Sequence, residues 1–181
     1  MKVIKTIQPV HIRAKGDRYI VDMGQNIAGW LRARICGNEG DTIRLRFAET
    51  LTPEGELYTA NLREAQSIDY YICNGKENGK TWAPRFVYHG FRYVEISGYK
   101  DAELSDFTGE VVSDEVEPTG TFECSDETLN RVYKNAWWGI LGNYKACPSI
   151  VRNATSASLG WATAPWAAGA KATCSTSTRF I

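Results

Sequence analysis

The chain has 181 residues, of which 43% are hydrophobic, which is enough to bury one core with a small appendage. Its formal net charge is zero, which argues against a nucleic-acid-binding protein that depends on phosphate contacts. The sequence contains neither an apolar run of about 18 residues nor a signal-peptide pattern, so we expect a soluble, cytoplasmic protein.

The sequence offers no pattern for a metal or a cofactor. Its five cysteines are widely spaced, and no C-x-x-C or Cys/His cluster accompanies them. No phosphate-binding loop or dinucleotide fingerprint occurs either. We therefore expect free thiols, no metal and no cofactor.

Short alternating segments dominate the chain from about Val10 to Ser113. Gly, Asn, Asp and Pro separate them, as is typical of strands joined by turns. The segment Thr50–Ser67 lacks a clean period and is expected to be a long loop with at most one helical turn. So many short strands predict an all-β protein, an antiparallel β-sandwich or jelly roll. The expected strands are Arg18–Met23, Trp30–Ile35, Thr42–Ala48, Asp69–Cys73, Trp82–Val87, Phe91–Ser97, Phe107–Val112 and Gly120–Cys124.

Two of these strands carry arginines at alternate positions. Arg32 and Arg34 lie in one, Arg44 and Arg46 in the next, and the six residues between the strands have the length of a hairpin loop. We therefore expect an antiparallel pair with one apolar face and one arginine-bearing face. That face could dock an acidic partner, but arginines paired with nearby carboxylates are the more common arrangement, and we favour it.

Aromatic residues are dense around His89, in the run from Arg85 to Tyr93. Exposed aromatic rings stack on sugars, yet aromatic-rich strands more often form a core, which is the interpretation we favour. His89 has no Ser/His/Asp or Cys/His set among its sequence neighbours, so no nucleophilic site is expected there.

An amphipathic helix of roughly Asp126 to Leu141 follows the strands. Ser125 is a suitable N-cap, and apolar residues such as Leu129 and Val132 recur at helical spacing. The chain contains no second helix against which this stripe could pack. Such a helix usually belongs to a larger assembly.

The character of the sequence changes after Cys147-Pro148. Of the 33 residues from Ser149 to Ile181, 18 are Ala, Ser or Thr, and no acid occurs after Glu127. We expect the chain to end in an irregular tail, with residues after about Tyr144 lacking stable tertiary contacts.

Several motifs resemble the β-sandwich domain of bacterial α-L-rhamnosidases over about 100 residues. The combination of D-x-G-Q-N-x-x-G with F-x-Y-H-G-F-R-Y is specific. The segment from Gly120 to Asn130 then resembles the linker into the (α/α)6-barrel catalytic domain of that family. The matching segments are V-D-M-G-Q-N-I-A-G-W (21–30), A-E-T-L (48–51), L-Y-T-A-N-L-R (57–63), D-Y-Y-I (69–72) and R-F-V-Y-H-G-F-R-Y-V-E-I (85–96).

The resemblance implies three parts. Residues 1–117 would be the β-sandwich domain, residues 118–147 the linker and first helix of a catalytic domain that is otherwise missing, and residues 148–181 a low-complexity tail. The parent enzyme would hydrolyse terminal α-L-rhamnosides with inversion. Its partners here would be a rhamnose-containing glycoside and the missing catalytic domain, with no nucleic acid or membrane. Sugar or domain-interface contacts are expected at Asn61, Arg85, Tyr88 and His89, and no residue is assigned a catalytic role.

The family's acidic motif, close to D-C-P-Q-R-N-E-R-Q-P-W-L-G-D, should follow Cys147-Pro148, and this chain lacks it. A shifted reading frame, in which each codon takes the third base of one codon and the first two of the next, permits that motif. Its acids would fall at residues 149/150, 155/156 and 162/163. We therefore hypothesise a frameshift near Cys147, with a natural low-complexity tail as the alternative.

Two functional hypotheses follow. The first is a truncated α-L-rhamnosidase fragment that is itself inactive, because no catalytic residue can be assigned. The second is a free-standing carbohydrate-binding or scaffold module, since sandwich folds host many functions.

Overall fold

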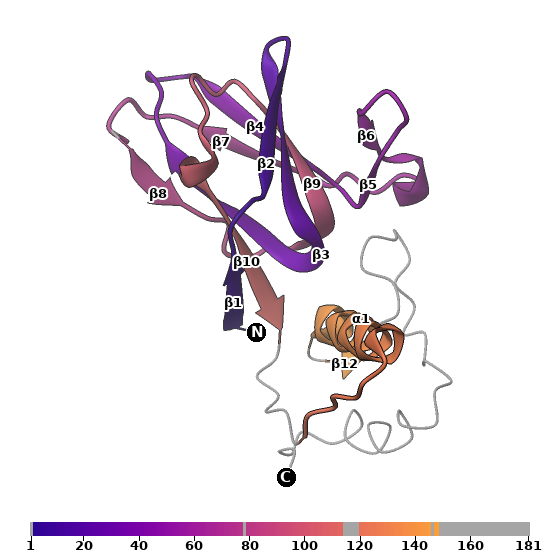
Figure 1. Cartoon of the computed structure of the whole chain (residues 1–181). Helices are drawn as coiled ribbons and strands as arrows, with labels where there is room; N and C mark the ends of the chain where they lie inside the picture. The colour runs from indigo at the N-terminus through magenta and orange to yellow at the C-terminus, as the bar shows by residue number, and fades with distance from the viewer. Residues whose placement is uncertain (1, 78, 114–119, 146, 149–181) are drawn as a thin grey trace.

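The computed structural model describes residues 2–77, 79–113, 120–145 and 147–148. Nearly all of the regular structure before residue 114 is strand, and one α-helix follows it (Figure 1). The strands are β1 (Lys2–Ile7), β2 (His11–Lys15), β3 (Arg18–Ile35), β4 (Thr42–Ala48), β5 (Thr50–Leu51), β6 (Leu57–Tyr58), β7 (Ile68–Ile72), β8 (Lys80–Trp82), β9 (His89–Ser97), β10 (Phe107–Ser113), β11 (Tyr144–Lys145) and β12 (Cys147–Pro148). The helices are α1 (Glu127–Asn143) and the 3-10 turns η1 (Ala60–Leu62) and η2 (Leu104–Asp106).

Eight strands form one curled antiparallel sheet in the order β1-β10-β3-β9-β4-β7, with β2 and β8 also paired to β3. The curl centres on β3, which pairs with β2 and β9 along its first half and with β10 and β8 near its end. β1 is the edge strand beyond β10, and in this pair Lys2 lies opposite Ser113. The predicted all-β sandwich followed by one helix is confirmed.

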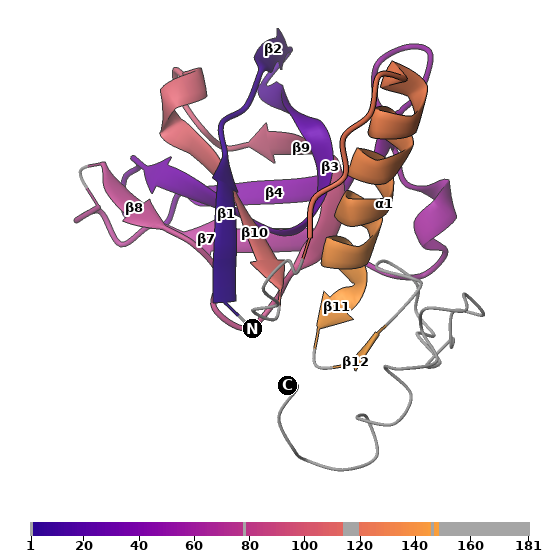
Figure 2. The same ribbon diagram turned by 60° about the horizontal axis from the view of Figure 1, so that its bottom comes forward.

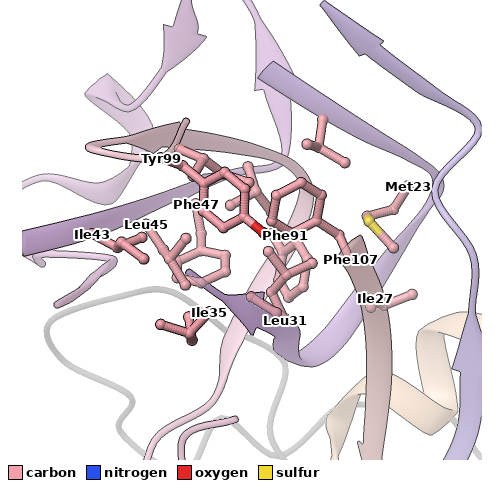
Figure 3. Packing of buried hydrophobic residues seen from close by; sticks show 14 of the residues in the cluster. Met23, Ile27, Leu31, Ile35, Ile43, Leu45, Phe47, Phe91, Tyr99 and Phe107 are labelled. Carbon is pink, nitrogen blue, oxygen red and sulfur yellow. The ribbon is translucent and has the colours of Figure 1, made fainter. Parts of the chain in front are cut away.

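The core lies inside this curl and is built from the inward positions of the alternating strands. Phe47, Phe91 and Phe107 are all essentially buried, and Figure 3 shows them packed among branched aliphatic side chains such as Leu31 and Leu45. Burial of each such side chain contributes about 1.5–3 kcal/mol. The alternation read from the sequence therefore identified the inward-facing positions.

The predicted pairing of Trp30–Ile35 with Thr42–Ala48 is wrong. In the sheet β9 lies between β3 and β4, and β4 pairs with β9 and β7. The alternating pattern determines which side of a strand is buried, but it does not determine which strand lies beside it. The two arginine pairs therefore belong to separate parts of the sheet rather than to one face of a hairpin.

Strand boundaries also differ from the expectation. Arg18–Met23 and Trp30–Ile35 are parts of the single strand β3, which stays continuous through a bulge. β8 ends at Trp82, so residues 83–87 form a loop rather than a strand. Gly120–Cys124 is irregular, while the short strands β1 and β2 had no clear signal in the sequence.

The helix α1 begins one residue later than expected because Asp126, not Ser125, is its cap. Asp126 Oδ1 accepts hydrogen bonds from the backbone N–H groups of Thr128 (2.7 Å) and Leu129 (3.3 Å). A carboxylate at this position satisfies two otherwise unpaired amides and complements the helix dipole.

One side of α1 packs on the sandwich, contrary to the expectation of a helix without a packing partner. Trp138 and Leu141 contact the core, and the Leu141 carbonyl accepts a hydrogen bond from Ser113 Oγ at 3.0 Å. Figure 2 shows the helix lying along β3. The opposite side is exposed, with 51% of Leu129 and 57% of Val132 accessible to solvent.

Candidate functional site

His89 opens β9 and is the residue around which the expected contacts cluster in sequence. Its side chain is buried and stacks on Phe47, with ring centroids 4.4 Å apart and planes 18° apart. Nδ1 lies 3.0 Å from Ser67 Oγ, and Nε2 lies 2.9 Å from Asp69 Oδ1. Since a carboxylate only accepts, Nε2 donates to Asp69, while a serine hydroxyl can either donate to Nδ1 or accept from it.

The three residues form a Ser/His/Asp set that inspection of sequence neighbours does not reveal. Ser67 and Asp69 belong to the β7 region and His89 to β9, and β4 lies between these strands in the sheet. A nucleophilic serine must be reachable by its substrate. Ser67 is 8% exposed and His89 7%, so we interpret the set as a buried polar cluster that fixes β7 against β9.

Arg85 and Tyr88 lie in the loop between β8 and β9. All of residues 85–88 are exposed, and the side chain of Phe86 is completely so, whereas Phe91 is buried as expected. The expectation that this aromatic run forms core is therefore confirmed for its second half and wrong for its first. The loop presents apolar surface directly beside the buried His89.

Asn61 lies apart from this loop in sequence, on the 3-10 turn η1 between β6 and β7, and is exposed. The turn confirms the single helical turn expected within Thr50–Ser67. A chain segment of a few residues joins Asn61 to Ser67, so η1 leads directly into the polar cluster around His89.

The D-x-G-Q-N motif builds the bulge in β3. Asp22 Oδ1 accepts a hydrogen bond from the Gly24 amide at 2.7 Å, and Arg92 donates to both carboxylate oxygens of Asp22 at 2.8 and 2.9 Å. Asn26 Nδ2 donates to Glu49 at 2.9 Å. Partial burial acts to raise the pKa of Asp22, but the hydrogen bonds from Arg92 and Gly24 outweigh it and hold that pKa below its ordinary value.

Gly29, the last glycine of the same motif, allows β3 to approach β10 closely. A Cβ atom at this position would lie 1.9 Å from the carbonyl oxygen of Glu110. Residue 29 must therefore be glycine for this strand pair to keep its spacing. The specific motifs thus account for the bend and the spacing of the sheet.

The arginine pairs are neutralised by carboxylates, as expected. Arg32 lies 3.1 Å from Glu110 and Arg34 2.9 Å from Asp106, in one part of the sheet. In the other part, Arg46 lies 3.0 Å from Glu95, which is itself buried.

A cleft of about 410 Å³ lies beside the first arginine pair. It lies between β3, β8, β10 and η2, and Asp106 is its one acidic lining residue in the part of the chain that the structure describes. The lining residues are Arg32, Arg34, Thr81, Ser105, Asp106 and Thr108.

Across the described ranges, no three His, Cys, Asp or Glu side chains come together in a way that would hold a metal ion. The helices within those ranges fall short of the length and hydrophobicity that a membrane-spanning helix requires.

The sheet and its motifs define a concanavalin-like β-sandwich domain. The family model for the bacterial alpha-L-rhamnosidase concanavalin-like domain matches residues 12–113. The chain belongs to the bacterial α-L-rhamnosidase family, as the motifs indicated.

Similar proteins and structures carry the same name. An alpha-L-rhamnosidase of Streptomyces avermitilis is 40% identical over 144 residues, which is 79% of this chain and 14% of that protein. The crystal structure of Streptomyces avermitilis alpha-L-rhamnosidase complexed with L-rhamnose superimposes with a TM-score of 0.79 at 36% identity, covering 84% of this chain and 15% of that one. The alpha-L-rhamnosidase structure from Dictyoglumus thermophilum gives 0.82 at 38% identity, covering 86% and 18%. The chain thus spans less than a fifth of the length of these relatives.

Proposed function

We propose that this chain is a fragment of an α-L-rhamnosidase. Residues 1–117 are its β-sandwich domain, and residues 118–147 are the linker and first helix of the catalytic domain. The match of the family model to residues 12–113 is the observation that carries the proposal. The small share of the relatives that the chain covers supports a fragment rather than a complete enzyme.

In this proposal the parent enzyme hydrolyses terminal α-L-rhamnosides with inversion. Inverting glycosidases place an acid and a base about 6.5–9.5 Å apart on opposite sides of the sugar. Among the described residues that line the cleft beside β10, the one acid is Asp106, whose carboxylate already binds Arg34 and the Glu103 amide. We therefore expect the chain alone to be inactive.

The test is an assay of the purified chain with an aryl α-L-rhamnoside, beside a full-length α-L-rhamnosidase as a positive control. We expect release of the aryl group at the rate of the blank. Turnover that follows the protein through two chromatographic steps, and that a mock preparation lacks, would contradict the proposal.

The exposed side of α1 supports the presence of a missing partner. A stripe containing Leu129 and Val132 faces solvent on the side of the helix opposite Trp138 and Leu141, which pack on the sandwich. Covering an apolar stripe of this kind with another element removes it from water and stabilises the fold. In this proposal the covering element is the rest of the catalytic domain.

We also propose that residues 148–181 derive from a shifted reading frame. These residues lie almost entirely outside the described part of the chain, and support comes from the sequence alone. The shifted frame permits the family's acidic motif at the expected place. Re-sequencing the gene around the Cys147 codon tests this, and a shifted frame that does not encode the motif would rule it out.

The alternative is a carbohydrate-binding module that acts through the loop before β9. The complete exposure of Phe86 and the exposure of Arg85 and Tyr88 favour it. Titration with L-rhamnose, using Tyr88→Ala as the test variant and Tyr70→Ala as a matched control on an exposed strand position, separates the alternatives. Binding that Tyr88→Ala alone abolishes would support the module.

A further inference from the structure

The cleft beside β10 has the size of a small-ligand site, and its residues are distinct from the Arg85–Tyr88 loop. Its volume of about 410 Å³ falls within the range of about 300–1,000 Å³ typical of small-ligand sites. All six lining residues are polar, and they come from four separate elements of the fold.

The two guanidinium groups of the cleft are held from behind by buried carboxylates. Asp106 holds Arg34 through Nε at 2.9 Å, and its second oxygen accepts the Glu103 amide at 3.0 Å. Glu110 holds Arg32 and also accepts a hydrogen bond from Trp30 Nε1 at 2.6 Å.

The carboxylate side chains of Asp106 and Glu110 are 4% and 11% exposed, whereas about half of each arginine side chain is exposed. The donors are therefore oriented before any ligand arrives, which lowers the entropic cost of binding.

The charges of the cleft select against an ion. Arg32 and Arg34 are balanced by Asp106 and Glu110, and exposed Glu103 adds a further negative charge beside Ser105. An anion would gain little electrostatic binding energy in this cleft, and a cation would be repelled by the two guanidinium groups. The binding energy of a neutral ligand does not depend on the net charge of the cleft.

The remaining lining groups are hydroxyls, at Thr81, Ser105 and Thr108. A hydroxyl both donates and accepts, and a guanidinium donates in a fixed fork that spans two neighbouring oxygens. Neighbouring hydroxyls on a sugar ring offer this pattern of two acceptors that are also donors. None of the lining residues within the described ranges is aromatic, so these residues offer no ring for stacking and binding is expected to be weak.

We propose that this cleft binds one neutral saccharide unit through its vicinal hydroxyls. The inference stands apart from the parent enzyme's catalysis, because it requires neither the missing catalytic domain nor an acid and base pair. It also differs from the module alternative, whose contacts lie in the loop before β9.

The test is a titration of the whole ¹⁵N-labelled chain with L-rhamnose, followed by NMR at the amides of Thr81, Ser105 and Thr108. Saturable shifts at these amides are expected, and sodium sulfate or D-galacturonate should not compete. Ser105→Ala should weaken binding several-fold without affecting the fold, because its hydroxyl contacts only Glu103 at 3.4 Å. Arg34→Gln should weaken it by about tenfold or more.

Arg44 is a partly exposed arginine in the other part of the sheet, so Arg44→Gln is the matched control. This variant should bind the sugar with the same affinity as the unsubstituted chain. Three results would overturn the proposal. They are an absence of saturable shifts at the cleft amides, shifts confined to residues 85–88, and competition by sulfate, which would indicate an anion site. Unchanged affinity in Ser105→Ala together with Arg34→Gln would overturn it as well.

Discussion

Replacing Gly29 with alanine should destabilise the sandwich more than any surface substitution. The added Cβ would lie 1.9 Å from the Glu110 carbonyl oxygen, 2.9 Å from its carbon and 3.2 Å from the Val111 Cα. Protein Cβ atoms essentially never approach another heavy atom closer than 3.0 Å, so β3 and β10 would have to separate by about 1.1 Å. That displacement weakens two or three ladder hydrogen bonds at about 1 kcal/mol each and adds about 1–3 kcal/mol of overpacking.

We therefore expect Gly29→Ala to lose about 3–6 kcal/mol of the free energy of unfolding, a large part of the about 5–15 kcal/mol of a typical domain. Urea denaturation of the whole chain, followed by circular dichroism of the strands, measures it. Gly120→Ala is the matched control, because nothing lies within 4 Å of a Cβ at that position. A loss below about 1 kcal/mol in Gly29→Ala would refute the reasoning that glycine sets this strand spacing.

Three further predictions follow from single side chains. His89→Ala leaves Ser67 and Asp69 without a hydrogen-bond partner inside the fold and should cost about 2–4 kcal/mol in urea denaturation, and a cost near zero would show that the cluster is hydrated. Burial raises the pKa of Tyr99 above its ordinary value, so its contribution to stability is present below about pH 10 and is lost as the pH rises beyond it. Tyr99→Phe should therefore show a smaller fall in its urea midpoint between about pH 9 and 11, and an equal fall would contradict this. Val132→Glu should lower light scattering by the purified chain at an unchanged melting temperature, because 57% of Val132 is exposed, and unchanged scattering would mean that this stripe does not drive association.

The alternation of residues was sufficient to predict the class of fold, and its limits are visible at β3 and β4. Leu45 and Phe47 face the core as predicted, because a period of two depends only on the strand itself. The neighbour of β4 is β9, some forty residues later in the chain, and the choice depends on long-range packing that no local window contains. Residues 36–41 have the length of a hairpin loop, but β3 and β4, the strands they join, do not pair with each other.

The polar cluster could not be predicted for a similar reason. Ser67 lies just before β7, Asp69 lies in β7 and His89 opens β9, and these two strands are not neighbours in the sheet, so the sequence spacing of the three residues carries no geometric signal. The motif around Asp22 is visible in the sequence, but the bulge that it forms is not. The bulge depends on Arg92, seventy residues away, which donates hydrogen bonds to both carboxylate oxygens of Asp22.

The pairing of Lys2 with Ser113 affects how the sheet folds during synthesis on the ribosome. Among the strands of this sheet β1 is synthesised first and its partner β10 last, so β1 stays unpaired until nearly the whole sheet has been translated. Contacts of such long sequence separation fold slowly, and an unpaired leading strand is open to capture by a neighbouring nascent chain. Lys2 and Lys5 on this strand are charges that discourage such edge-to-edge capture during the wait.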